Sequence, residues 1–79
     1  MDVKIGCVYK HFKGNVYLVV GIANHSESGE KMVVYKALYG DFCLYVRPYD
    51  MFVEKVDKIK YPGVAQEYRF ELVEGKVVL

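Results

Sequence analysis

The stretch VVYKALYGDFCLYVR, residues 33–47, decides the fold that we predict for this chain of 79 residues. Valine, tyrosine and other β-forming residues dominate both of its halves. Between them stands YGDF, whose Gly40-Asp41 pair suits the central positions of a tight hairpin turn, where positive φ angles are needed. The stretch therefore predicts two short antiparallel strands joined by a two-residue turn.

A two-residue turn also fixes the register of its strands, and alternate side chains then form two faces. The face that we assign to the core carries Val33, Tyr35, Ala37, Tyr39, Phe42, Leu44 and Val46. The opposite face groups Lys36, Tyr45 and Arg47, where two cations beside a ring could hold an anion or stack on a nucleobase. The alternative is a solvated strand face whose long side chains cover a ring. A register slip of one residue would move Arg47 to the side of Tyr35.

The rest of the chain repeats this pattern of short apolar segments separated by Gly, Asn, Asp and Pro, which is typical of an all-β domain. We expect strands at residues 3–9, 16–24, 32–39, 42–47, 52–56 and 68–74. Pro48 is expected to end a strand, YDMF (residues 49–52) to form one helical turn, and Gly75 to turn the chain into an edge strand or tail. These elements predict a single domain, residues 1–79, folded as a small barrel or a strongly bent sheet.

Composition limits the classes of function. Hydrophobic residues make up 53% of the chain and aromatic residues 15%, enough for one compact core without a metal or disulfide staple. Eleven Lys and Arg residues oppose ten Asp and Glu, for a formal net charge of +1. That balance does not favour a protein held mainly by phosphates, although it leaves room for a local basic patch.

The compartment is predicted from cysteines and from the N-terminal segment. Cys7 and Cys43 are expected to be free, buried thiols of a cytoplasmic protein, with a disulfide as the alternative. MDVKIGCVYK has no basic region followed by an apolar stretch, so we predict no signal peptide. The longest apolar run, VYLVVGIA, is too short to span a membrane, and no membrane partner is expected.

The polar cluster ANHSESGEK, residues 23–31, admits a catalytic, a metal-binding or a purely structural interpretation. In an extended strand His25 and Glu27 would share a side while Ser26 points away, so the serine is not placed for activation by its neighbour. Ser26 to Gly29 also fit a polar turn in which Gly29 adopts a left-handed conformation. We favour the turn, with ligand contacts as the second interpretation and catalysis as the third.

Two further positions could contribute to a site. His11 and Lys13 could lie on one side of the chain at the predicted turn KGN (residues 13–15), where they are either exposed turn residues or ligand contacts. Arg47 precedes Pro48 and is therefore held extended, free to pair with a carboxylate or phosphate, or with an internal Glu54 or Glu71. No metal site is predicted, because the histidines and cysteines lack the close paired spacing of a structural zinc site.

Several blocks of the sequence, YKHFKGNVYLVVGIANHSE, VVYKALYG, VRPYDMF and the later EYRF, resemble a small bacterial family of domains of unknown function. The similarity runs over residues 6–56, about two-thirds of the chain. The resemblance implies an SH3-like β-barrel of five to six strands and implies no reaction. The matching positions are His11, Lys13, Gly14, His25, Ser26, Glu27, Tyr35, Tyr39, Arg47, Pro48, Met51 and Phe52. Tyr45 stands where a tryptophan is expected, so the resemblance does not make one large ring essential for stacking.

Taken together, these features predict a binding module without a cofactor rather than an enzyme. Its site would be a groove at the rim of the loops, with ligand-binding candidates His11, Lys13, His25, Ser26, Glu27, Tyr35, Tyr45 and Arg47. The expected partner is a small anionic or heterocyclic molecule or a peptide segment. The alternatives are a nucleic-acid contact domain, an enzyme with His25 as acid or base, and an assembly domain that self-associates through an edge strand.

Overall fold

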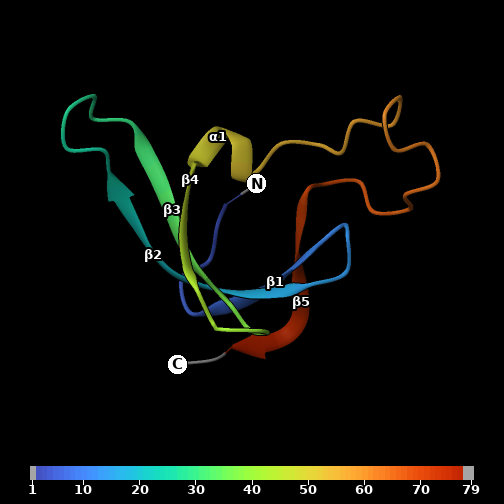
Figure 1. Cartoon of the computed structure of the whole chain (residues 1–79), viewed down its shortest axis with the longest axis horizontal. Helices are drawn as coiled ribbons and strands as arrows, with labels where there is room; N and C mark the ends of the chain where they lie inside the picture. The colour runs from blue at the N-terminus through green and yellow to red at the C-terminus, as the bar shows by residue number, and fades with distance from the viewer. Residues whose placement is uncertain (1, 78–79) are drawn as a thin grey trace.

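The computed structural model describes residues 2–77, with side chains described as far as residue 73. Five antiparallel strands form one sheet in the order β4-β3-β2-β1-β5. They are β1 (Cys7–His11), β2 (Val16–Asn24), β3 (Lys31–Ala37), β4 (Leu44–Pro48) and β5 (Phe70–Val77), and one helical turn, α1 (Tyr49–Phe52), follows β4 (Figure 1). The predicted all-β class is confirmed.

The predicted boundaries agree best in the first half of the chain. β2 spans the residues predicted for it, and YDMF forms α1. Three expectations are wrong: β1 begins at Cys7 rather than at residue 3, residues 52–56 contribute only an isolated bridge between Lys55 and Tyr68, and β5 continues through Gly75. The predicted tail beyond Val77 lies outside the described residues.

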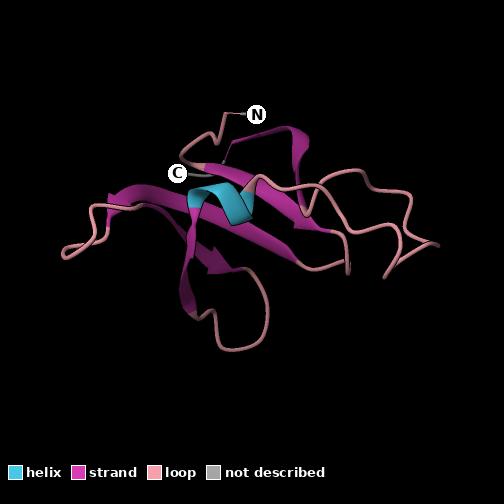
Figure 2. Cartoon of the chain, turned by 90° about the horizontal axis from the view of Figure 1, so that it is seen from above, coloured by secondary structure: helices cyan, strands magenta, loops and turns pink. Residues whose placement is uncertain are grey.

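The sheet is bent but, over residues 2–77, it does not close into the expected barrel. Its two edges are β4 and β5. The loop at residues 25–30 and the long segment at residues 53–69 extend at opposite sides of the molecule, with α1 between them (Figure 1). Seen from above, α1 lies over the strands near the middle of the molecule (Figure 2). The bend therefore gives the sheet an inner face, part of which the helix covers.

A bulge in β2 contributes to the bend. Val19 pairs with Tyr35, whereas Gly21 pairs with Val34, so β2 carries one residue more than β3 between these pairs. A bulge increases local twist and changes the alternation of side chains. As a result Val19 is fully buried, and Ile22, three residues on rather than two, also packs against the core.

The hairpin between β3 and β4 differs from the predicted two-residue turn. The Ala37 amide N–H donates to the Cys43 carbonyl at 2.9 Å, which leaves five residues, 38–42, in the loop. Gly40 and Phe42 both have positive φ, 57° and 56°. Such a φ is uncommon for a bulky side chain, and here it allows the longer loop to return the chain.

The longer loop shifts the predicted register by one residue. Tyr35 pairs with Tyr45 rather than with Val46. Leu44 and Val46, predicted in the core, therefore point outward with 62% of each exposed, while Tyr45 and Arg47 lie on the inner face with Tyr35. The assignment of the β3 residues to the core is confirmed, since Val33, Tyr35 and Ala37 are buried, whereas Tyr39 and Phe42 are exposed.

Pro48 ends β4, as predicted, although as its last residue it still pairs with Met32. Hydrogen-bonded and non-hydrogen-bonded pairs alternate along an antiparallel ladder. Because Ala37 and Cys43 form a hydrogen-bonded pair, Val33 and Arg47 form another, and the next pair, Met32 and Pro48, is a non-hydrogen-bonded one. The nitrogen of Pro48 therefore points to the free edge of the sheet. A proline at such a position removes no ladder hydrogen bond.

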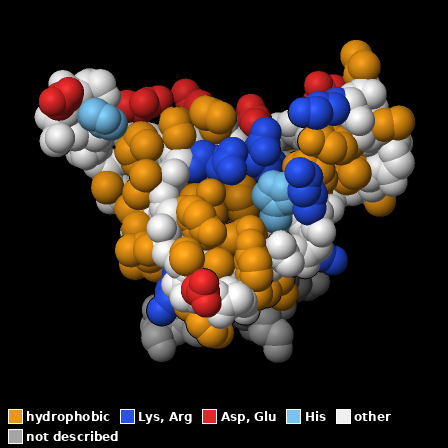
Figure 3. Space-filling view, viewed as in Figure 1, with side chains coloured by type: hydrophobic (Ala, Val, Ile, Leu, Met, Phe, Trp, Pro, Cys, Tyr) orange, Lys and Arg blue, Asp and Glu red, His pale blue; other side chains and the backbone are white. Residues whose placement is uncertain are grey.

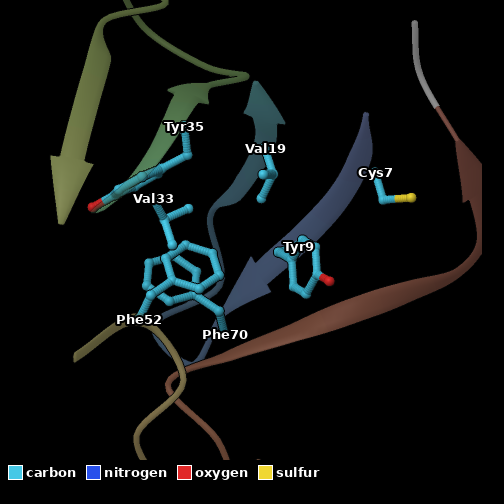
Figure 4. Close-up of a cluster of buried hydrophobic side chains, with 7 residues drawn as sticks. All are labelled: Cys7, Tyr9, Val19, Val33, Tyr35, Phe52 and Phe70. Atoms are coloured by element: carbon cyan, nitrogen blue, oxygen red, sulfur yellow. The ribbon is translucent and has the colours of Figure 1, made fainter. Parts of the chain in front are cut away.

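The core lies between the inner face and α1 (Figure 4). Its buried cluster consists of Cys7, Tyr9, Val19, Val33, Tyr35, Phe52 and Phe70. Phe52 of α1 stacks on Phe70 of β5, with ring centroids 4.1 Å apart and planes 4° apart. Met51, also expected in the core, is 45% exposed. The helical turn thus inserts one ring between strands that are distant in sequence.

Both cysteines are free, as predicted, but only one is buried. Cys7 belongs to the core, whereas Cys43, which directly precedes β4, is exposed. The helical content of the described residues is the four-residue α1, so none of it is long enough to cross a bilayer.

Candidate functional site

The inner face of the sheet carries a group of aromatic rings, of which Tyr35 and Phe70 are buried against Phe52 of α1 and others are partly exposed. We call it the aromatic face and define it by Tyr17, Tyr35, Tyr39, Tyr45 and Phe70, together with Arg47 and His11. Each of the strands β1 to β5 contributes at least one of these residues, and Tyr39 lies in the loop that follows β3. Figure 3 shows an apolar area in the middle of this side of the molecule, with Lys, Arg and histidine side chains gathered next to it.

Arg47 is the central cation of the aromatic face. Its Nε donates to the Tyr35 hydroxyl at 3.2 Å, and its guanidinium carbon lies 5.8 Å from the centre of the Phe70 ring. The side chain is half-buried. Among the side chains of residues 2–73, no carboxylate lies within salt-bridge distance of it. The arginine is therefore fixed by neutral groups and keeps its charge available.

Glu54, one of the two internal partners expected for Arg47, forms an ion pair with another arginine instead. Glu54 pairs with Arg69, which donates to the same carboxylate oxygen from Nε, at 2.9 Å, and from Nη2. The other candidate, Glu71, accepts from the backbone N–H groups of Glu67 and Tyr68 instead. The carboxylates that could have neutralised Arg47 are thus used elsewhere.

Tyr17 organises the tyrosines of the aromatic face. Its ring makes edge contacts with those of Tyr35, Tyr39 and Tyr45, with centroids 5.4, 5.6 and 6.5 Å apart. Its hydroxyl shares a hydrogen bond of 2.9 Å with that of Tyr39. Burial, followed by this hydrogen bond, raises the pKa of Tyr17 well above its ordinary value. The Tyr17 phenol is therefore neutral at pH 7. Tyr39 and Tyr45 are each about 40% exposed and present ring surface to solvent.

His11 borders the aromatic face on the β1 side. Its ring stacks on Phe12 at 4.4 Å and meets the edge of Phe70 at 4.9 Å. Its Nδ1 accepts the backbone N–H of Lys13 at 3.1 Å, which assigns the proton of the neutral ring to Nε2. Burial, followed by the positive charges of Arg69, Arg47 and Lys13, lowers the pKa of His11 to about 4. His11 is thus an uncharged donor at neutral pH.

The lowered pKa of His11 predicts a loss of stability in acid. Between about pH 6.5 and pH 4 the unfolded chain binds a proton at this ring that the folded chain does not, so the free energy of unfolding falls as the pH falls through this window. We expect the contribution to be about 1–2 kcal/mol after allowance for solvent screening. Urea unfolding at both ends of the window should show a smaller decrease for His11→Gln than for the native chain. His25→Gln, at an exposed ring, is the matched control; an unchanged pH dependence in His11→Gln would contradict the prediction.

The cluster around His25 is separate from the aromatic face. His25 follows the nine-residue β2 and His11 precedes it, so they lie roughly 25 Å apart along the strand. The Nδ1 atom of His25 accepts the backbone N–H groups of Glu27 and Ser28 at 3.2 and 3.4 Å, and Gly29 has a φ of 76°. These contacts form the polar turn that we favoured. His25, Ser26 and Glu27 are all exposed there.

The structure therefore brings four of the eight candidate residues, His11, Tyr35, Tyr45 and Arg47, onto one face, with exposed Lys13 next to it. Sequence reasoning missed Tyr17, Arg69 and Phe70. Alternation along β2 could have placed Tyr17 on the face of Val19, but Arg69 and Phe70 are brought in by long-range pairing of β5 with β1. Within residues 2–73 no group of three or more His, Cys, Asp or Glu side chains is arranged to hold a metal ion.

Comparison with known proteins supports the fold and identifies a family. The sequence matches DUF1653, described as a protein of unknown function, over residues 7–72. The crystal structure of a DUF1653 protein from Bordetella bronchiseptica is similar with a TM-score of 0.76 and 34% sequence identity, covering 99% of this chain and 95% of that one. No curated protein sequence matches the chain.

Proposed function

Because the chain belongs to the DUF1653 family, whose function is unknown, we propose a function from the geometry of its aromatic face: a binding module for planar, anionic ligands. The observation that carries the proposal is the state of Arg47. It is oriented by Tyr35 and Phe70, half-buried, and without a carboxylate partner among the described side chains. A fixed and unpaired guanidinium is suited to bind a carboxylate or a phosphate.

The hydrogen-bonding capacity of Arg47 supports an anionic ligand. A guanidinium has five N–H donors, and the Nε donor is used by Tyr35. None of the side chains described accepts from its Nη atoms. Two parallel donors match the two oxygens of a carboxylate or phosphate, and such charge-assisted pairs are stronger than neutral hydrogen bonds. The Tyr35 contact also reduces the freedom that Arg47 would lose on binding.

The rings around Arg47 support a planar ligand. Tyr45 lies beside Tyr35, with ring centroids 5.7 Å apart, and 42% of Tyr45 is exposed. An aromatic or heterocyclic group could stack there while its anionic group reaches the guanidinium. His11, which contacts Phe70 edge to face, would add a neutral Nε2–H donor. The proposed chemistry is binding, and no bond-breaking step is assigned to these residues.

Titration with small probes tests this proposal. We expect benzoate and uridine monophosphate to shift the NMR signals of Arg47, Tyr45 and His11, and inorganic phosphate, which has no ring, to shift them less. Bound anion should also raise the pKa of His11, because it offsets the neighbouring positive charges. Arg47→Met should weaken binding of both planar probes by about 10–100-fold, the worth of a charge-assisted pair.

Lys36→Met is the matched control, because Lys36 is exposed and pairs with Leu44 on the outer face of the sheet. Its affinity for both probes should equal that of the native chain. Arg47→Lys keeps the charge but lacks the planar fork, so an intermediate affinity is expected. Equal binding of benzoate by the native chain and Arg47→Met, both shown to be folded by their NMR spectra, would overturn the proposal.

A further inference from the structure

The row of rings continues beyond the aromatic face onto two loops. His11 stacks on Phe12 at 4.4 Å, and Phe12 contacts Tyr61 with centroids 4.9 Å apart. Phe12 lies in the β1–β2 turn and Tyr61 in the long segment between α1 and β5. Segments far apart in sequence thus extend the line of rings. We call Phe12, Lys13, Lys60 and Tyr61 the loop arm.

The loop arm pairs its rings with cations. The Lys13 Nζ lies 5.9 Å from the centre of the Phe12 ring and 5.7 Å from that of Tyr61, and the Lys60 Nζ lies 5.4 Å from that of Tyr61. Neither lysine forms a salt bridge with a described side chain. Phe12 and Tyr61 are half-buried, so each keeps some exposed ring surface.

Arg69 directly precedes β5 and lies next to the loop arm. It lines an open pocket of about 320 Å³ together with Lys60, Tyr61 and three other residues. Two carboxylates of that pocket are occupied: Glu54 pairs with Arg69, and Asp57 accepts the backbone N–H groups of Ile59 and Lys60. The lining thus carries three cations, Lys55, Lys60 and Arg69, against these two carboxylates, and Lys60 forms no salt bridge with a described side chain.

From this arrangement we infer that the aromatic face and the loop arm together bind single-stranded nucleic acid. The inference rests on the proposed function, since Arg47 and Tyr45 would hold one nucleotide. The loop arm would receive a later nucleotide of the same strand, with its phosphate at Lys13 or Lys60 and its base against Phe12 or Tyr61. Successive ring-and-cation pairs match the repeat of base and phosphate in a strand, whereas a small anion needs a single pair. A duplex hides its bases from these rings, and an acidic peptide offers no bases to stack.

Fluorescence anisotropy with a labelled oligothymidylate of about eight nucleotides tests the inference. If about three cations contact phosphates, raising salt from about 50 to about 200 mM should weaken binding roughly 20-fold, from a slope of about −0.7 per contact. The oligonucleotide should bind more tightly than uridine monophosphate. A duplex of the same length and an acidic peptide of similar charge should bind more weakly; equal binding of either would overturn the inference in favour of simple charge attraction.

Two variants separate this inference from the proposed function. Lys60→Ala and Tyr61→Leu should each weaken oligonucleotide binding several-fold and leave uridine monophosphate binding unchanged, with Lys36→Ala as the control for loss of an exposed charge. Unchanged melting temperatures would show that the loss is not due to unfolding. Two results would show that the inference is wrong while the proposed function stands, provided that uridine monophosphate binds through Arg47. In the first, the oligonucleotide binds no more tightly than uridine monophosphate. In the second, both variants bind the oligonucleotide as tightly as the native chain does. If neither probe binds, both are wrong.

Discussion

Phe52→Ala should remove a large part of the protein's free energy of unfolding at 25 °C. Phe52 is fully buried, stacks on Phe70, and contacts the rings of Tyr9 and Tyr35 with centroids 5.7 and 5.4 Å away. Removing a buried phenylalanine ring costs about 3–5 kcal/mol, from lost transfer free energy and the cavity left behind. A domain of this length has a total stability of about 4–12 kcal/mol. The loss is therefore a large part of the whole, because one ring joins α1 to β1, β3 and β5.

Met51→Ala is the matched control, since Met51 is the neighbouring residue of the same helical turn and is 45% exposed. We expect its free energy of unfolding to change by less than about 1 kcal/mol. Circular dichroism during urea denaturation measures both variants. Similar midpoints for Phe52→Ala and Met51→Ala would contradict the assignment of Phe52 to the core.

Val33→Asp should also abolish stable folding, whereas the same change at Val46 should be tolerated. Val33 is fully buried in the middle of β3, and an unpaired carboxylate there would have to be desolvated or protonated. The cost is expected to exceed about 4 kcal/mol, among the largest that a single substitution causes. Val46 is 62% exposed on edge strand β4, so Val46→Asp should cost about 1 kcal/mol or less, mainly in β-propensity.

This pair of variants tests the register of the β3–β4 hairpin. With a two-residue turn at Gly40-Asp41, both valines would face the core and both substitutions would unfold the protein. With Tyr35 paired to Tyr45, only Val33 faces inward. Melting curves of the two variants measured at neutral pH separate these registers, and a large loss of stability in Val46→Asp would refute the observed one.

The functional hypothesis depends on the same register. In the predicted register Arg47 shared a face with Lys36, and Tyr35 was in the core opposite it. In the structure Arg47 donates a hydrogen bond to Tyr35 and lies over Phe70, while Lys36 lies on the outer face. The one-residue slip considered for the sequence is the arrangement that occurs, and it converts two separate features into a single face.

Local patterns were sufficient where the determining forces are local. β-forming residues and turn formers predicted β2 and the all-β class, and Gly29 has the left-handed conformation expected from the turn around it. The turn at residues 13–15 and the helical turn YDMF were also predicted, because backbone φ preferences act within a few residues. The burial of Val33, Tyr35 and Ala37 followed from their alternation along β3.

The remaining features depend on contacts between distant segments. Whether the 38–42 loop or a two-residue turn joins β3 and β4 changes the register by one residue, and a slip of one residue inverts every side chain of β4. Similarly, Phe70 reaches the aromatic face only because β5 pairs with β1, where Phe70 lies opposite His11. The sequence by itself determined that strands form and that their side chains alternate. Only the tertiary structure decided which side of β4 faces inward, because the contacts of Arg47 with Tyr35 and Phe70 join different strands and cannot be predicted from local turn preferences.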